Sequence, residues 1–272
     1  MQKKNKIIVI TLFIILLIYF LSLTCYISYY GRIAYKDFYL NLLVEATSII
    51  VEFGVLGFVL SYFLDKNDEK VQIMRLKNEI DYIRFLRTDE TKFKIFGIIK
   101  QLNDLKENSI HLQNCNLSFL TELSKVNLTN SKLHVTDFSH SIMKTAILNN
   151  TEGERTNFQH TKLSGSIIQE SKFIRCNFNN SLSKSVSFKG THFSNTTFIN
   201  ANLFSSKFLK CTFNNCDFSN SMLERVDFKG STFNQVNFNE ADVSGANFND
   251  CNNFSVNLIS TAKNNNLIQL IV

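Results

Sequence analysis

The chain has 272 residues, of which 44% are hydrophobic, and it contains 26 phenylalanines but no proline and no tryptophan. Its formal net charge is +6, yet between residues 112 and 258 Lys and Arg number 13 against 11 Asp and Glu. That segment is therefore nearly neutral, which argues against a nucleic-acid-binding surface and equally against an acidic surface that mimics DNA. The absence of proline also excludes a proline-rich linker between domains.

Two apolar segments predict a transmembrane helical hairpin within residues 1–64, with spans at about 7–30 and 38–64. No small-x-small cleavage site follows the first segment, so we expect an uncleaved span rather than a signal peptide. Lysines and arginines flank the outer ends of the two spans, whereas only Arg32 and Lys36 lie between them. The positive-inside rule therefore predicts a multi-pass protein of the cell (inner) membrane with its N- and C-termini in the cytoplasm.

Two carboxylates, Glu45 and Glu52, lie seven residues apart on one face of the second span. A carboxylate at this depth is costly, so it usually marks a functional position. One hypothesis is that this polar face drives assembly of a homo-oligomer, with Gly54 and Gly57 allowing close approach of helices. The other is that the carboxylates line a pore or ion path.

Residues 65–106 predict a cytoplasmic helical connector that ends in a cap on the following domain. The connector begins with apolar residues at a/d spacing, which would extend the second span and help to pair neighbouring subunits. These residues are Ile73, Leu76, Ile80 and Ile83.

The cap is a second amphipathic helix, which follows a predicted break and N-cap at Thr88-Asp89-Glu90-Thr91. A solenoid needs such a cover because its end coil is otherwise open. Its predicted apolar positions are Phe93, Phe96, Ile99 and Leu102.

From Leu123 to Phe248 an apolar centre, nearly always Phe or Leu, recurs every five residues, and a small residue, from Thr121 onward, stands two positions before each centre. A period of five fits neither an α-helix nor a plain strand. Columns twenty residues apart hold like residues, which predicts a coil of four five-residue sides stacked at about 4.8 Å. Glycines and asparagines gather two residues after the centre, where a corner tolerates left-handed φ. One such column is Phe138, Phe158, Phe178, Phe198, Phe218 and Phe238.

At the C-terminal end, Asn253 interrupts the repeat and Leu258 is predicted to resume it once. Residues 261–272 form a predicted C-terminal cap or tail, in which 267–272 fold back on the last coil.

The repeat follows the pattern small–Asp/Asn–Leu/Phe–x–x, as in Ala201-Asn202-Leu203 and Cys216-Asp217-Phe218. In this it resembles the pentapeptide-repeat family. The resemblance implies a right-handed quadrilateral parallel β-helix, here over residues 107–260. Some members of that family bind DNA gyrase by mimicking DNA, but this chain lacks the acidic surface that such a role needs, so a gyrase-binding DNA mimic is only the third hypothesis.

No catalytic, cofactor-binding or metal site is evident in the sequence. The cysteines of the repeats fall on the small interior position and are expected to act as buried small residues. Cys176 and Cys216 share a column but lie two coils apart, which is too far for a disulfide. His140 and His160 are expected to stack on the outside, although two imidazoles alone make a poor metal site.

The leading hypothesis is therefore a membrane-anchored, non-catalytic scaffold that offers a rigid β-helical rod for protein–protein interaction. Its expected partners are the membrane lipid bilayer, further copies of the chain through the hairpin and an unknown cytoplasmic protein, with nucleic acid unlikely. The alternative is a membrane effector whose hairpin assembles into a pore or ion path through Glu45 and Glu52.

Overall fold

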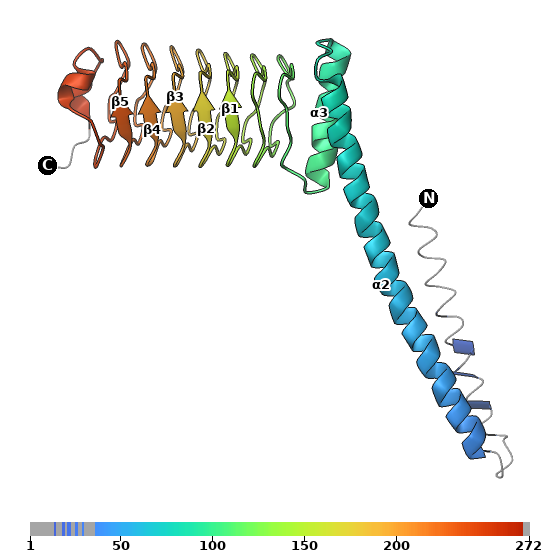
Figure 1. The fold of residues 1–272 in the computed structure, drawn as a ribbon. Helices are drawn as coiled ribbons and strands as arrows, with labels where there is room; N and C mark the ends of the chain where they lie inside the picture. The colour runs from blue at the N-terminus through green and yellow to red at the C-terminus, as the bar shows by residue number, and fades with distance from the viewer. Residues whose placement is uncertain are drawn as a thin grey trace. The chain divides into compact units, whose positions relative to one another are not determined.

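The computed structural model describes residues 36–268 and eight positions before them, namely Ile14, Ile18, Tyr19, Leu21, Ser22, Cys25, Tyr26 and Tyr29. Most of the predicted first span, 7–30, and the end of the tail, 269–272, lie outside the described residues. The chain separates into two compact units, Met1–Val71 and Gln72–Val272 (Figure 1).

Helix α2 (Lys36–Ile83) is continuous over 48 residues. Within the described residues it is the one helix long and apolar enough to cross a membrane, over Val44–Ile83. The sequence divides this stretch at residue 64 into a span and a connector, but α2 runs through that point without a break.

Helix α3 (Asp89–Asp104) begins where the sequence predicts it, because the Thr88 side chain accepts a hydrogen bond from the Thr91 backbone N–H at 3.1 Å. Its predicted apolar face is partly wrong, since Phe93 is 61% exposed and Phe96 is only half-buried. The residues that pack on the first coil are Ile95, Ile98, Ile99 and Leu102.

The last turns of α2 also belong to this core. Leu76, Ile80 and Ile83 are buried together with the isoleucines of α3 and the first coil. The prediction that these a/d residues pair neighbouring subunits is therefore wrong, because their own chain already covers them.

The remainder of the second unit is a parallel β-solenoid with a coil of twenty residues (Figure 1). In the coil that starts at Ser141, sides 1, 2, 3 and 4 are centred on Met143, Leu148, Gly153 and Phe158, and later coils repeat them. Side 3 forms a five-stranded parallel sheet, and the other sides pair through single bridges such as Ile142↔Lys162. The strands are β1 (Glu152–Glu154), β2 (Lys172–Ile174), β3 (His192–Ser194), β4 (Thr212–Asn214) and β5 (Thr232–Asn234).

Stacked rings and buried donors fill the interior. The phenylalanines of side 4, from Phe138 to Phe238, stack with ring centroids 4.6 to 5.4 Å apart and are at most 1% exposed. At many of the positions two places before a centre, a Ser, Thr or Cys donates its hydroxyl or thiol to the carbonyl of a centre in the coil below. Thr191 Oγ1 reaches Ile168 O at 2.7 Å, and Cys211 Sγ reaches Phe188 O at 2.7 Å. These contacts pair the buried hydroxyls and thiols, and some of the carbonyls, such as Phe188 O, accept a backbone N–H as well.

The corners confirm the expected backbone conformation. The residue two places after each centre has a left-handed φ, of 51–63° where it is not glycine. Asparagine and glycine adopt this region most easily, which explains why they gather there.

Both ends of the solenoid depart from the predicted frame. Thr121 is exposed, and Leu120, which is 2% exposed, enters the core instead, because the first coil pairs with the next at an offset of 21 residues, as in His111↔Lys132. At the other end Phe254 stacks on Phe248 at 4.4 Å, and Ile259 rather than Leu258 is fully buried.

The C-terminal cap contains two short 3-10 helices, η2 (Val256–Ile259) and η3 (Asn265–Leu267). The Gly245 backbone N–H donates to Leu267 O at 2.9 Å, and the backbone of Lys263 forms a parallel β-bridge with that of Asp242 in the last full coil. The described part of the tail thus folds back on the solenoid as predicted.

Candidate functional site

The carboxylates predicted within the membrane lie on α2, where residues seven apart differ by only about 20° around the helix axis. Glu45 and Glu52 are both exposed on this helix. Ser48, which was not predicted, lies one turn away on the same face and donates its hydroxyl to Glu52 Oε1 at 3.5 Å. Its spacing in the sequence, three residues after Glu45 and four before Glu52, could have identified it.

The two glycines do not share this face. At about 100° per residue, Gly54 lies about 200° and Gly57 about 140° around the axis from Glu52. A Cβ added at Gly57 would meet nothing within 4 Å. Any close approach of a helix at these glycines would thus be a contact separate from the Glu45–Glu52 face.

The lateral sides of the solenoid are held rigid by ordered side chains. On side 4, Asn157 Nδ2 donates to Asp137 Oδ1 at 3.0 Å, and Asn237 repeats this contact with Asp217 at 3.0 Å. The same carboxylate also accepts a backbone N–H two residues on, as Asp137 does from Ser139 at 2.9 Å. Asn or Asp before the centre therefore serves both the turn and the ladder between coils.

The outward histidines stack as the sequence predicts. The rings of His140 and His160 lie 4.6 Å apart, and Phe119 extends the stack below His140 at 4.5 Å. Among the described residues, no group of three or more His, Cys, Asp or Glu side chains could hold a metal ion.

The cysteines of the solenoid occupy the small interior position, as expected. Burial raises the pKa of Cys211 to about 12 and that of Cys176 to about 11. Both thiols donate to backbone carbonyls, at 2.7 and 3.4 Å. These groups are therefore protonated packing residues, unsuited to act as nucleophiles.

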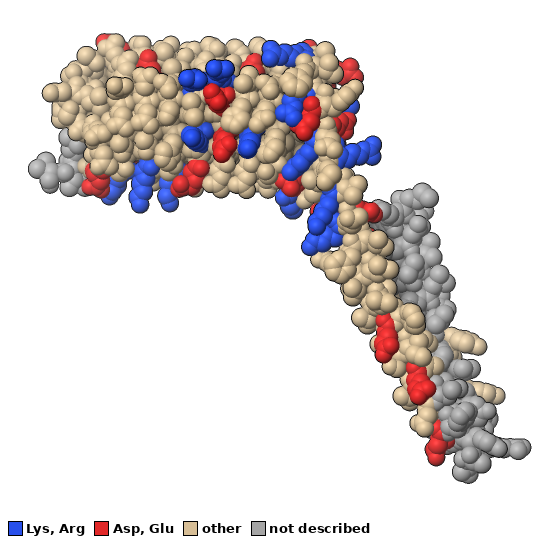
Figure 2. Space-filling view, viewed as in Figure 1, with Lys and Arg blue, Asp and Glu red and all other residues tan. Residues whose placement is uncertain are grey.

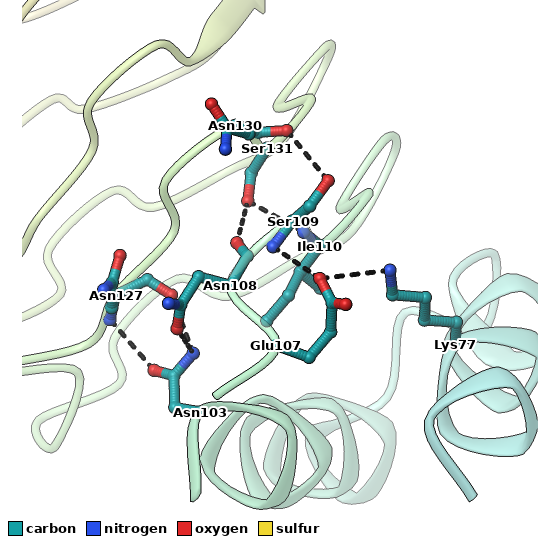
Figure 3. A network of polar contacts seen from close by, with 9 residues as sticks. All are labelled: Lys77, Asn103, Glu107, Asn108, Ser109, Ile110, Asn127, Asn130 and Ser131. Atoms are coloured by element: carbon teal, nitrogen blue, oxygen red, sulfur yellow. Dashed lines mark hydrogen bonds and ion pairs between the residues drawn. The ribbon is translucent and has the colours of Figure 1, made fainter. Parts of the chain in front are cut away.

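The N-terminal edge of the solenoid is closed by polar side chains from the helices and the loop after them (Figure 3). The Asn103 amide imitates a paired strand, because its Nδ2 donates to Asn127 O at 2.7 Å and its Oδ1 accepts from Asn127 N at 2.9 Å. Glu107 Oε1 accepts from the Ser109 backbone N–H at 2.8 Å and pairs with Lys77 at 3.2 Å.

Another cation covers side 3 of the first coil, where Arg84 Nη1 donates to Gln113 O at 3.4 Å. Beside it, partial burial lowers the pKa of His111, and Lys132, Lys77 and Arg84 lower it further. An exposed strand edge invites pairing with other chains, so these contacts protect the rod from edge-to-edge association.

Comparison with known proteins agrees with this geometry. Residues 184–220 and 211–250 match the family described as pentapeptide repeats, in eight copies. Residues 184–250, the C-terminal half of the solenoid, are thus made of pentapeptide repeats. No curated protein matches the chain.

Several solved structures are similar to it. HetL, a pentapeptide repeat protein from the cyanobacterium Nostoc sp. strain PCC 7120, is 17% identical over 57% of this chain and 68% of its own, with a TM-score of 0.34. A trypsin-treated form of QnrB1, a plasmid-mediated fluoroquinolone resistance protein, is 13% identical over 60% of this chain and 80% of its own, with a TM-score of 0.37. A pentapeptide repeat protein of the Arabidopsis thaliana thylakoid lumen is 22% identical over 37% and 72%, with a TM-score of 0.25.

Proposed function

We propose that the chain is a membrane-anchored, non-catalytic scaffold whose pentapeptide-repeat domain presents its lateral sides to another protein at the cytoplasmic face of the cell membrane. The observation that carries this proposal is the order of the outward side chains. Ladders such as Asn157–Asp137 and Asn215–Asn195 fix polar groups before any partner arrives. A surface ordered in advance loses little conformational entropy when it binds.

The anchor in this proposal is α2, whose apolar length suits a bilayer, together with the apolar segment at residues 7–30. Copies of the chain assemble through the face that holds Glu45, Ser48 and Glu52. A carboxylate facing lipid is costly, whereas a partner helix can hydrogen-bond to it. Homo-oligomerisation is thus the arrangement that best accommodates this face.

The scaffold role is tested by placing a photo-crosslinking residue on each side in turn, in full-length protein in native membranes. Suitable exposed positions are Lys184 on side 1, Lys189 on side 2, Arg175 on side 3 and Asn239 on side 4. We expect one side to crosslink repeatedly to one protein, with the other three as matched controls. Crosslinking from no side, or equally from all four, would contradict the proposal, as would release of the chain from membranes by alkaline carbonate.

The second candidate, an ion path, is supported by the same arrangement of Glu45, Ser48 and Glu52 on one face. Vesicles that contain the full-length protein are compared with vesicles that contain the Glu45→Gln/Glu52→Gln variant. Glu69→Gln/Glu90→Gln is the matched control, since Glu69 lies beyond the apolar part of α2 and Glu90 lies in the first turn of α3. A scaffold leaves all three preparations tight. Leakage that only the first variant abolishes would favour the ion path instead.

A further inference from the structure

The near-neutral total charge of the solenoid conceals a separation of charge between its sides. In the coils from residue 141 to 210, the ten-residue segments that build sides 1 and 2 hold six lysines and one acidic residue, Glu170. The segments that build sides 3 and 4 hold three basic and two acidic residues. The next segment of sides 1 and 2, 221–230, is balanced, with two residues of each sign. The six lysines are Lys144, Lys162, Lys184, Lys189, Lys207 and Lys210.

These six lysines, which we call the lysine flank, are all exposed. Among the described residues, none of them has a carboxylate oxygen within the 4.0 Å of an ion pair, although Lys229 and Lys263 further along do, with Asp250 and Glu240. On side 3 Arg175 pairs with Glu154 at 3.5 Å. Lys132 and Lys172, although they form no ion pair within the described residues, both have Glu152 as their neighbour in register. Figure 2, which views the solenoid from the side of β1–β5, accordingly shows acidic and basic groups next to one another. The charge of the lysine flank is therefore left for a partner.

Side 4, which lies opposite side 2, completes the contrast. From Thr136 to Glu240 its outward positions include no lysine and no arginine, and they carry Asp137, Asp217 and Glu240. These three acidic residues lie outside residues 141–210, so in the coils of the flank side 4 has no charged residue and the positive charge is confined to sides 1, 2 and 3, most of it on sides 1 and 2. Such a distribution orients a protein on a charged surface.

From this we infer that the lysine flank lies on an anionic lipid surface, an inference that rests on the proposed membrane anchoring. The flank is long and flat, and aliphatic side chains stand among its lysines, with Ile167 39% exposed and Ile147 and Leu182 half-buried. Lysine stems and aliphatic groups together suit the boundary between headgroups and acyl chains. Clusters of basic residues close to a bilayer are attracted by its anionic lipids.

The residue types favour lipid over nucleic acid or a specific acidic protein. All six cations are lysines, which act as mobile point charges, whereas arginine provides the paired geometry that recognises phosphate or carboxylate groups. Grooves that bind single-stranded nucleic acid also interleave aromatic rings for stacking on bases. In the same segments Phe204 is the single aromatic residue that faces outward, and the Arg225 guanidinium lies 5.8 Å from its ring centroid.

The test is to label the lysines of full-length protein in vesicles with an amine-acetylating reagent that does not cross membranes, and to quantify each site by mass spectrometry. One vesicle type is phosphatidylcholine alone and the other includes phosphatidylglycerol. We expect the six flank lysines to react several-fold more slowly on the anionic vesicles. Lys132 and Lys172 on side 3 are the internal controls and keep their rates. The difference should disappear at about 1 M salt, where the Debye length is about 3 Å.

Two variants that each remove three charges sharpen the result. Lys162→Gln/Lys184→Gln/Lys207→Gln should abolish the protection of the remaining flank lysines, whereas Lys132→Gln/Lys172→Gln/Arg175→Gln should preserve it. Equal labelling on both vesicle types would refute the inference. Protection of the flank by added double-stranded DNA, with none by anionic vesicles, would assign it to nucleic acid instead.

Failure of the anchoring gives a different result. A chain without an anchor does not float with neutral vesicles, yet it still shows protection of the flank when it is mixed with anionic ones. Flotation with both vesicle types together with equal labelling would leave the anchor intact and overturn the flank alone.

Discussion

The role of Asn103 in closing the solenoid edge can be tested by changing the amide nitrogen of its side chain to an oxygen. Replacing Asn103 by aspartate keeps the shape of the side chain but removes both hydrogens of Nδ2. Those hydrogens are donated to Asn127 O at 2.7 Å and to Asn108 Oδ1 at 3.1 Å (Figure 3). Two lost bonds and two acceptors left facing a carboxylate cost about 2–4 kcal/mol.

The penalty should depend on pH. The two neighbouring acceptors disfavour the charged carboxylate, so the pKa of the new aspartate rises in the folded chain above its ordinary value. A carboxyl with a raised folded pKa destabilises the fold above that pKa. The penalty of Asn103→Asp is therefore full at about pH 7 and shrinks toward about pH 4, where the protonated carboxyl donates again.

The assay is amide hydrogen exchange, because a solenoid couples neighbouring coils and the effect should stay local. Amides of residues 127–135 should exchange roughly 30- to 700-fold faster in Asn103→Asp at neutral pH, while those of 207–218 stay unchanged. Asn78→Asp on the exposed face of α2 is the matched control. Equal exchange in the two variants, or equal acceleration along the whole solenoid, would refute the edge-pairing role.

Three further predictions address the interior. Phe198 is fully buried between rings at 4.7 and 4.9 Å, so Phe198→Ala should lower the free energy of unfolding by about 3–5 kcal/mol and Phe198→Leu by less than half of that, as measured by urea unfolding. Because the pKa of Cys211 is about 12, its thiol should resist iodoacetamide in the folded protein at both pH 8 and pH 9, whereas half-buried Cys251 reacts first among the cysteines of the solenoid; complete alkylation of Cys211 in the folded protein would contradict its burial. Gly153→Leu restores the consensus of the repeat, yet it should destabilise by about 1–3 kcal/mol, since a Cβ there would lie 2.7 Å from a phenylalanine ring of the next coil; a raised unfolding midpoint would show that the ring can move aside.

The solenoid could be predicted from sequence because each interior position is repeated in every coil. The same logic fails where the repeat begins. Thr121 stands two residues before Leu123, as a small interior residue should. The local five-residue pattern therefore selects Thr121, and it does not predict that Leu120 enters the core instead. What decides between them is the 21-residue offset of the first coil, visible in the pairing of Asn116 with Asp137, which requires one additional residue at this point.

The caps and the candidate sites were harder to predict from sequence, because their contacts are not repeated along the chain. In α3, Phe93 and Ile95 both begin a helical spacing of apolar residues, and only packing on the first coil selects the isoleucines. Asn103 lies in a polar stretch, and its role depends on Asn127, 24 residues away. A stronger signal was available for the lysine flank, because sorting outward residues by side rather than by total charge reveals it in the sequence alone.

The positions of individual lysines support the proposal that the lysine flank binds a surface outside the protein. Lys162 stands where Asn or Asp usually closes the turn, and its neighbours in register are Ile142 and Leu182. It therefore forgoes a side-chain hydrogen bond of about 1 kcal/mol and receives no charge partner in return.

Lys210 also occupies a position that is unfavourable for its side chain. It adopts a φ of 54° at a corner where Gly190 and Gly230 occupy the coils on either side. A side chain in this region costs about 1–2 kcal/mol relative to glycine. Lys172 on side 3 differs, since its register neighbour is Glu152. Neither Lys162 nor Lys210 has an ion-pair partner within the described part of the fold, and the proposed anionic bilayer would provide one.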